Sequence, residues 1–441
     1  MKYFFYSLLI IISNNLYANN WNHKAIDLGL AHLKSQGIGI KVLVIDTGVD
    51  KSHPSISKNF VRGKNFVDEV SPSKLSYDYF DHNGHGTHVT SIITQVAPAT
   101  KIFVAKACNQ NKQCKLVDII MAIEWGISQG VDLINMSLGW DTEKRSGELI
   151  YQRLQSLNIP IVAAAGNSAN TETYWPGTLT YPAMYPETIS VGALNSQLIK
   201  SDFSQYGAAL DIYAPGEEIL AAVPIGQGRL TKISVIKSEA NTLIQSKLIE
   251  GSPINFRAIE APYQYIGMGH ENDFVTSELK NKICVISRGQ TDFWKMAMLS
   301  NKHGAKAVII IDNKKTGVSD GILDNGSKVI SSLIPILMIS KKDGLKLLQD
   351  NHATIQVSIE KTDYEQRSGT SFAAPHVTGI IALLKEINND LIPMEIKTIL
   401  QETSTSLSDN QKHNAKLINA YRAIELLLTK TNASTPGEYK L

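Results

Sequence analysis

The stretch KIFVAKACNQNKQCKLVDIIMAIEWGISQGVDLINMSL, residues 101–138, indicates the fold class of this chain. It opens and closes with short, nearly continuous apolar runs at 101–106 and 131–138, which suit strands that are buried on both faces. The segment between the runs carries apolar residues on one helical face, at Leu116, Ile119, Ile120, Ile123 and Ile127. A strand, a crossover helix and a second strand predict an α/β fold with an open, mostly parallel sheet.

Three further apolar runs, KVLVID (41–46), IPIVAAAG (159–166) and TISVGAL (188–194), extend the predicted sheet. From about residue 229 to 361 the chain is richer in lysine and in short β-like runs. Residues 368–387 then form a helix that is apolar on nearly all sides, as expected in the middle of a domain. The segment before this helix is therefore predicted to be an insertion whose two ends return to the same place.

Composition excludes some partners. Lys plus Arg number 43 and Asp plus Glu 41, a formal net charge of +2. Such a balance produces no field that would recruit nucleic acid or an anionic membrane, so neither is expected as a partner. Because the cysteines and histidines show no metal-binding spacing, no metal and no cofactor are predicted.

The first eighteen residues, MKYFFYSLLIIISNNLYA, combine Lys2, an apolar run over 4–12 and the small residue Ala18. This pattern predicts an export signal. The run is well short of the roughly 20 residues that span a bilayer, so a retained anchor is the weaker alternative. We expect the mature protein to be secreted or periplasmic.

Three cysteines fit an exported protein if two of them pair. Cys108 and Cys114 are six positions apart around a polar, turn-forming segment, so a disulfide between them is predicted, with two unpaired thiols as the alternative. Cys284 lies in an apolar strand pattern and is expected to be a small buried hydrophobe.

Three short segments could carry chemistry. Asp46 ends a strand, while His85 and Ser371 each open a helix. Groups at the carboxyl ends of parallel strands converge on one crevice. A serine hydroxyl needs an imidazole to take its proton, and the imidazole needs a carboxylate to orient it. The helix that starts at Ser371 offers free N–H groups to an oxyanion, and Asn167 could supply a second donor.

Taken singly, these residues would more often be caps or turn residues. Together with their neighbours they form the motifs VIDTGVD, GHGTHV, INMSLG, AAAGN, YPA, DFSQYG, YAPG and SGTSFAAPHVTG. In this order, across residue 19 to about 429, the motifs resemble those of the subtilisin-like serine proteases, the subtilases. The resemblance implies a three-layer fold around a central, mostly parallel sheet and the hydrolysis of protein or peptide substrates.

The resemblance also implies a role for each site residue. Asp46 orients His85, His85 is the general base, Ser371 attacks the substrate, and Asn167 forms the oxyanion hole with the Ser371 N–H. The substrate-binding residues that it implies are Ser137, Leu138 and Gly139 on a strand that pairs with the peptide, and Ala165 and Gly166 in a pocket wall. Pairing through the main chain predicts broad specificity.

The chain also departs from the subtilase pattern. Only residues 90–95 separate GHGTHV from VAP, which leaves no room for a calcium loop there. About 27 residues lie between Ala18 and Asp46, too few for an inhibitory propeptide. The alternatives are unaided folding, a separate chaperone or a longer precursor. The Cys108–Cys114 loop falls at the rim of the family's substrate cleft, where a disulfide would stiffen a recognition edge.

The insertion resembles a protease-associated domain, a small α/β module. It is predicted to act as a lid or exosite, with an oligomerisation surface and a passive insertion as alternatives. The predicted organisation is a signal peptide (1–18), a catalytic domain in two parts (19–231 and 361–430), the inserted domain (232–360) and a tail (431–441). The rival functions are a catalytically silent binding protein that uses the inserted module and a narrow processing protease.

Overall fold

The computed structural model describes residues 21–67, 78–142, 145–171, 174–236, 242–254, 256–313, 318, 321, 323, 331–349, 354–407 and 416–434. The predicted signal peptide, 1–18, lies outside these residues, as does most of the predicted tail. The chain divides into two compact units. The first unit contains the described residues up to Gln227 and from Asp363 onward, and the second unit is Gly228–Thr362.

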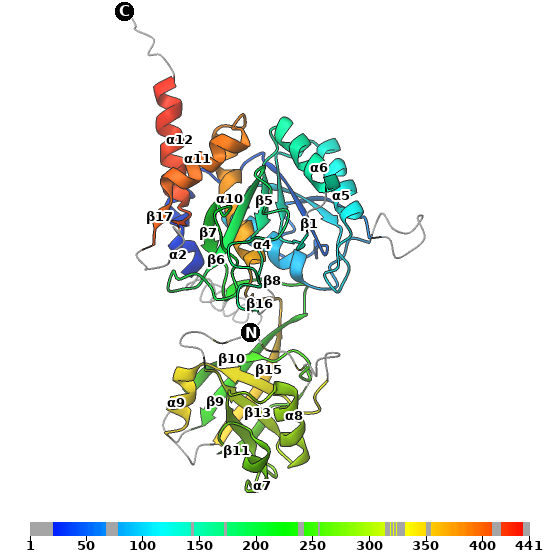
Figure 1. Ribbon diagram of the computed structural model, residues 1–441, viewed down its shortest axis with the longest axis vertical. Helices are drawn as coiled ribbons and strands as arrows, with labels where there is room; N and C mark the ends of the chain where they lie inside the picture. Colours follow the sequence, from blue (N-terminus) through cyan, green and yellow to red (C-terminus); the bar gives the residue numbers. More distant parts are fainter. Residues whose placement is uncertain are drawn as a thin grey trace, which may run out of the picture. The chain divides into compact units, whose positions relative to one another are not determined.

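The first unit is built on a nine-stranded sheet, with the order β17-β18-β7-β6-β5-β4-β1-β3-β2 (Figure 1). All its neighbouring strands are parallel except β17 and β18. The strands are β1 (Lys41–Asp46), β2 (Phe60–Asn65), β3 (Lys101–Lys106), β4 (Leu133–Met136), β5 (Ile161–Ala164), β6 (Thr188–Leu194), β7 (Ile212–Pro215), β17 (Thr405–Ser406) and β18 (Lys416–Leu417). This topology confirms the predicted α/β class.

Helices cover both faces of this sheet. One face carries α5 (Leu116–Ser128) and α6 (Arg145–Ser156), seen together in Figure 1. The core on the other face contains residues from five helices, α3 (Leu28–Ala31), α4 (His85–Val96), α10 (Thr370–Ile387), α11 (Pro393–Thr403) and α12 (Ala420–Ser434). The short α2 (Trp21–Ala25) precedes α3, and β8 (Ile219–Ala222) pairs with β16 (Tyr364–Arg367) as a separate ribbon.

The interior strand β1 shows why the sequence has no alternation of polar and apolar residues here. Val42 and Val44 belong to the core under α4 and α10, whereas Leu43 and Ile45 belong to the core under α5 and α6. Successive side chains of a strand point to opposite faces, so a strand with a core on each face must be apolar throughout. The apolar run ends at Asp46, the residue at the carboxyl end of the strand.

The second unit is a closed barrel with the strand order β10-β14-β13-β12-β11-β15-β9. Its strands are β9 (Gly228–Ile236), β10 (Thr242–Leu248), β11 (Ile259–Tyr265), β12 (Ile283–Ser287), β13 (Ala307–Ile311), β14 (Ile336–Ile339) and β15 (Thr354–Thr362). Its helices are α7 (Glu271–Val275), α8 (Phe293–Lys302) and α9 (Lys341–Leu347). The unit extends slightly beyond the predicted 232–360 because β9 and β15 pair along their whole lengths.

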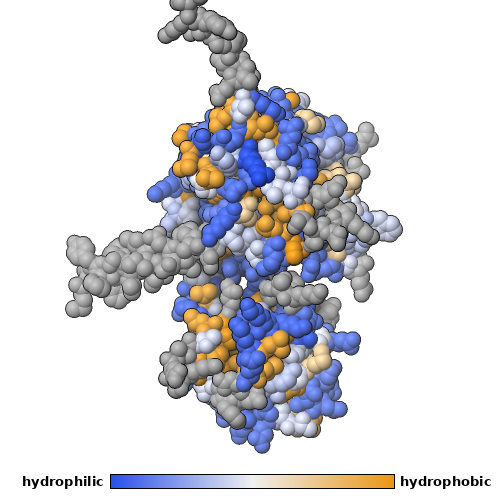
Figure 2. Space-filling model, turned by 90° about the vertical axis from the view of Figure 1, so that its left-hand side faces the viewer, coloured by the Kyte–Doolittle hydropathy of each residue, from blue (hydrophilic) through white to orange (hydrophobic). Residues whose placement is uncertain are grey.

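The surface is mixed in character. Figure 2 shows hydrophilic residues interspersed with smaller hydrophobic patches on the face in view. Large apolar side chains such as Leu33 and Trp175 are exposed. Within the described part of the chain, no helix has both the length and the apolar character needed to cross a membrane.

Candidate active site

A buried acid–imidazole pair lies where β1 ends and α4 begins. The Nδ1 of His85, the first residue of α4, lies 2.7 Å from Oδ1 of Asp46. The same oxygen accepts the backbone N–H of Thr47 at 2.7 Å, and Asp46 is only 1% exposed. A carboxylate on Nδ1 holds the proton there and leaves Nε2 free to accept another. The pair can therefore act as a general base.

A second buried carboxylate, Asp81, organises the start of α4 and was missed in the sequence. Its Oδ1 accepts hydrogen bonds from Thr47 Oγ1 and the Gly84 N–H, both at 2.8 Å. Its Oδ2 accepts both the N–H and the hydroxyl of Thr87 at 2.7 Å. An anion at a helix N-terminus is favoured by the free N–H groups there. The sequence signal that could have revealed Asp81 is its position shortly before His85, where a helix was predicted to begin.

Ser371 is the second residue of α10, and its carbonyl has an unusual partner. Pro375 lies inside the helix and has no N–H to donate to the carbonyl four residues earlier, which is that of Ser371. The hydroxyl of Ser137 donates to this carbonyl instead, at 2.7 Å. Asn135 Nδ2 donates in turn to Ser137 Oγ at 3.0 Å, and Thr378 Oγ1 donates to Asn135 Oδ1 at 2.8 Å. A buried chain of hydrogen bonds thus holds the backbone of Ser371.

The starts of α4 and α10 meet through a ring contact. The centroid of the His85 ring lies 5.3 Å from that of Phe372, the neighbour of Ser371. Within the described residues, no hydrogen bond joins Ser371 Oγ to His85 Nε2. Catalytic hydrogen bonds are often long in the absence of substrate and tighten when it binds.

Asn167 follows Gly166, just beyond β5, and faces the start of α10. Its Oδ1 accepts the N–H of Thr370 at 2.8 Å and the hydroxyl of Thr370 at 2.9 Å. These two bonds fix the orientation of the side-chain amide, whose nitrogen is its donor. A Cβ added at Gly369 would lie 3.5 Å from Asn167 Nδ2. The amide nitrogen of Asn167 therefore lies beside the turn that leads to Ser371.

The two segments predicted to bind substrate both contact the start of α10. Ser137 reaches it through the Ser371 carbonyl, and the N–H of Gly166 donates to Thr370 Oγ1 at 3.1 Å. Ser137 is buried, Leu138 half-buried and Gly139 exposed, so the segment emerges at the surface. A Cβ at Gly139 would come 2.5 Å from Thr180 Oγ1, a residue that the sequence did not indicate.

The glycine at 166 is required by its backbone as well as by its neighbours. Gly166 has φ +112°, which L side chains rarely adopt, and an added Cβ would overlap the Gln205 side chain. Ala165, beside it, is fully buried. The small residues of this segment therefore let the chain turn directly beside the start of α10.

Cys108 and Cys114 form a disulfide, and Cys284 is a buried free thiol. His88 and His376 are fully buried and contact main-chain carbonyls, in keeping with structural roles. Burial lowers the pKa of His376 to about 3 and holds the pKa of His88 well below its usual range. Across the described residues, no group of three or more His, Cys, Asp and Glu could hold a metal ion.

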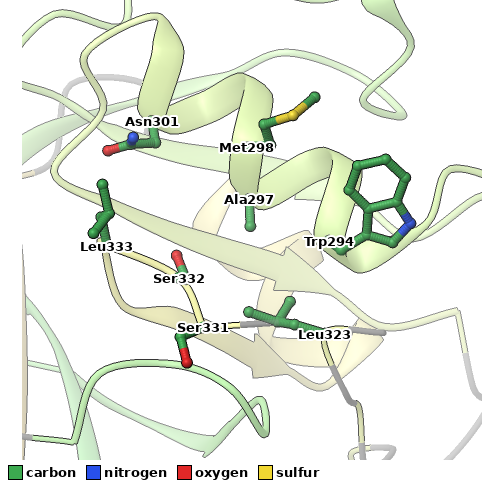
Figure 3. Close-up of a pocket in the computed structure, with 8 residues that line it drawn as sticks. All are labelled: Trp294, Ala297, Met298, Asn301, Leu323, Ser331, Ser332 and Leu333. Atoms are coloured by element: carbon green, nitrogen blue, oxygen red, sulfur yellow. The ribbon is translucent and has the colours of Figure 1, made fainter. Parts of the chain in front are cut away.

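An apolar pocket of about 270 Å³ lies in the second unit (Figure 3). One wall comes from α8, and the opposite wall comes from the chain that leads to β14. The lining residues are Trp294, Ala297, Met298, Asn301, Leu323, Ser331, Ser332 and Leu333. None of them is a predicted site residue.

Comparison with protein families gives two matches. The subtilase family matches residues 37–251 and 343–418, and the PA domain matches residues 256–347. The match to the PA domain lies within the second unit, and the subtilase match covers most of the first.

Curated proteins match slightly less than half of the chain. Subtilisin NAT of Bacillus subtilis subsp. natto is 38% identical over 199 residues, which are 43% of this chain and 50% of that protein. Subtilisin of Bacillus pumilus is 38% identical over 199 residues and is covered to 69%. The major intracellular serine protease of Bacillus subtilis is 32% identical over 237 residues and is covered to 73%. The chain spans about half the length of Subtilisin NAT and of several other curated relatives that it matches.

A solved structure resembles most of the chain. The psychrophilic subtilisin-like protease Apa1 of Pseudoalteromonas sp. AS-11 has a TM-score of 0.68 and 24% identity, covering 95% of this chain and 99% of that protein. At this identity the likeness concerns the fold, and it includes both units.

Proposed function

The chain belongs to the subtilase family, and from this membership we propose that it is a serine endopeptidase that cleaves peptide bonds through an acyl-enzyme on Ser371. The observation that carries the proposal is the 2.7 Å contact between His85 Nδ1 and Asp46 Oδ1, with the His85 ring against the residue that follows Ser371. This arrangement supports the proposal that His85 acts as a base for the serine at the start of α10.

In the proposed reaction, Ser371 Oγ attacks the carbonyl carbon of the scissile bond while His85 Nε2 takes the hydroxyl proton. Asp46 stabilises the resulting imidazolium. The amide of Asn167 and the N–H of Ser371 donate to the oxyanion. The imidazolium then protonates the departing amine. A water molecule next attacks the acyl carbonyl while His85 takes its proton, and the imidazolium returns that proton to Ser371 Oγ as the acid product leaves.

Residues 137–139 and 165–166 are proposed to hold the substrate, the first as a strand alongside an extended peptide and the second as a pocket wall. Main-chain pairing tolerates many side chains, which favours broad specificity. A narrow processing protease would instead cleave few members of a mixed peptide library. Cleavage profiling on such a library separates the two.

The inserted domain, 232–360, interrupts the sequence of the catalytic domain, whose two parts are 19–231 and 361–430. For this inserted domain we propose a role in admitting or positioning protein substrates. A catalytic role for this domain has no support from its pocket, which is apolar. Its rival role is an oligomerisation surface, which size-exclusion chromatography with light scattering would reveal. We expect protein or peptide substrates as partners and neither nucleic acid nor a membrane.

Export is proposed from residues 1–18 and is supported by the Cys108–Cys114 disulfide, a bond that persists in oxidising compartments. Amino-terminal sequencing of protein recovered outside the cytoplasm should begin at residue 19. Recovery of the intact amino terminus with the membrane fraction would favour the retained anchor.

A fluorophosphonate probe tests the central proposal, because it labels only an activated serine. Wild-type protein should be labelled and should hydrolyse a denatured protein, whereas Ser371→Ala should do neither. Ser196→Ala removes an exposed serine of the same unit and should behave as wild type. If neither wild type nor variants react, the chain is a silent binding protein instead.

A further inference from the structure

The loop closed by the Cys108–Cys114 disulfide reaches both members of the acid–imidazole pair. On one side, the N–H of Cys108 donates to the carbonyl of Asp46 at 3.2 Å. On the other side, Asn83 Nδ2 donates to the carbonyl of Gln110 at 2.8 Å. Asn83 Oδ1 accepts the backbone N–H of His85 at 3.2 Å. The Asn83 amide thus bridges the loop to the first turn of α4.

The loop is closed by its disulfide and is otherwise held by exposed hydrogen bonds. Residues 110–113 are exposed, so the loop tip buries no apolar surface. Inside it, Asn109 Oδ1 accepts the N–H groups of Asn111 and Gln113, and the N–H of Asn109 donates to the Gln113 carbonyl. Exposed hydrogen bonds of this kind open readily. Among the contacts that hold the Gln110 carbonyl in place, the disulfide is the one that does not open in this way.

We propose that this disulfide-closed loop positions the Asp46–His85 pair through Asn83, so that opening the loop slows the chemical step. The inference rests on the proposed function and names Asn83 as a positioning residue that acts through His85. Asp81 independently holds the start of α4, so the pair persists when the bridge is lost. Loss of one such hydrogen bond should lower kcat about threefold to tenfold.

A loop that only stiffened the substrate cleft would behave differently. Substrate would then bind less tightly while the bound complex reacted at the same rate. KM would rise and kcat would stay the same. The division between kcat and KM therefore distinguishes positioning of the pair from support of a recognition edge.

The test uses the full chain and a short chromogenic peptide substrate, with active sites counted by fluorophosphonate titration so that kcat refers to folded enzyme. Asn83→Ala and the double variant Cys108→Ser/Cys114→Ser should each lose threefold to tenfold in kcat with little change in KM. A variant that carries all three substitutions should lose no more kcat than Asn83→Ala alone, because all of them break the same bridge. Asn111→Ala, in the same exposed loop, is the matched control and should keep the wild-type kcat.

Reduction supplies a second, reversible arm. A dithiol transfers two electrons and two protons to the disulfide, leaving two cysteine thiols while the dithiol becomes a cyclic disulfide. This treatment should lower kcat of the wild type to the level of the double serine variant and leave that variant unchanged, and reoxidation should restore the rate. Unchanged kcat in the variants of an active wild type would overturn this inference alone. A wild type with no hydrolysis would overturn the proposed function and the inference with it.

Discussion

Replacing Ser137 by alanine removes the hydrogen bond to the Ser371 carbonyl, which has no helical donor because Pro375 lacks an N–H. Ser137 is 2% exposed, and its hydroxyl donates to the Ser371 carbonyl at 2.7 Å. Without the hydroxyl, that carbonyl loses its donor, and Asn135 Nδ2 loses its acceptor. A buried polar group left without a partner costs about 1–3 kcal/mol. We expect Ser137→Ala to lower the free energy of unfolding of the first unit by this amount.

A second substitution turns this expectation into a sharp test. Pro375→Ala returns an N–H to the helix at the position that faces the Ser371 carbonyl. In the double variant, this N–H replaces the lost hydroxyl, so most of the stability should return. The double variant is therefore predicted to be more stable than Ser137→Ala alone.

The assay is urea unfolding, with all variants made in Ser371→Ala so that self-digestion cannot distort the result. Ser371→Ala keeps the main-chain carbonyl under study. Ser196→Ala is the exposed control and should leave the midpoint unchanged. A Ser137→Ala protein as stable as its parent, or no recovery with Pro375→Ala, would refute the argument.

Three other predictions concern acid, the oxyanion and calcium. Burial lowers the pKa of His23 to about 4 and that of His376 to about 3, from 6.5, so below pH 6.5 the unfolded chain binds protons that the folded chain does not. Stability should be full above pH 6.5 and fall steadily toward pH 4, by roughly 3 kcal/mol from His23 alone. Urea midpoints of Ser371→Ala that do not change over this range would contradict the assignment. Asn167→Ala should lower kcat about 100-fold to 1000-fold, a magnitude known from a subtilisin, with little change in KM; a change confined to KM in steady-state assays would argue against an oxyanion role. Because residues 90–95 leave no room for a calcium loop, a chelator should not shift the melting temperature, and a sharp fall would contradict this expectation.

The fold class of the first unit and the presence of an insertion could both be predicted from the sequence. A strand with a core on each face must be apolar throughout, so runs such as that of β1 are visible without any knowledge of their neighbours. The candidate residues Asp46, His85, Ser371 and Asn167 were also local signals, because each lies at the end of a strand or the start of a helix within a short motif.

The side chains that support those residues could not be predicted in this way, because they come from distant parts of the chain. The Ser137 hydroxyl donates to the carbonyl of Ser371, which is 234 positions away in the chain. The sequence around Ser137 does not indicate this partner, and neither does the sequence around Ser371. Asn83 had no role predicted from the sequence, because its amide connects Gln110 with His85 only in the folded chain. The barrel of the second unit closes through β9 and β15, whose paired residues lie more than a hundred positions apart. Local patterns report which residues must be buried or capped, whereas a hydrogen bond between distant segments depends on how the whole chain brings their backbones together.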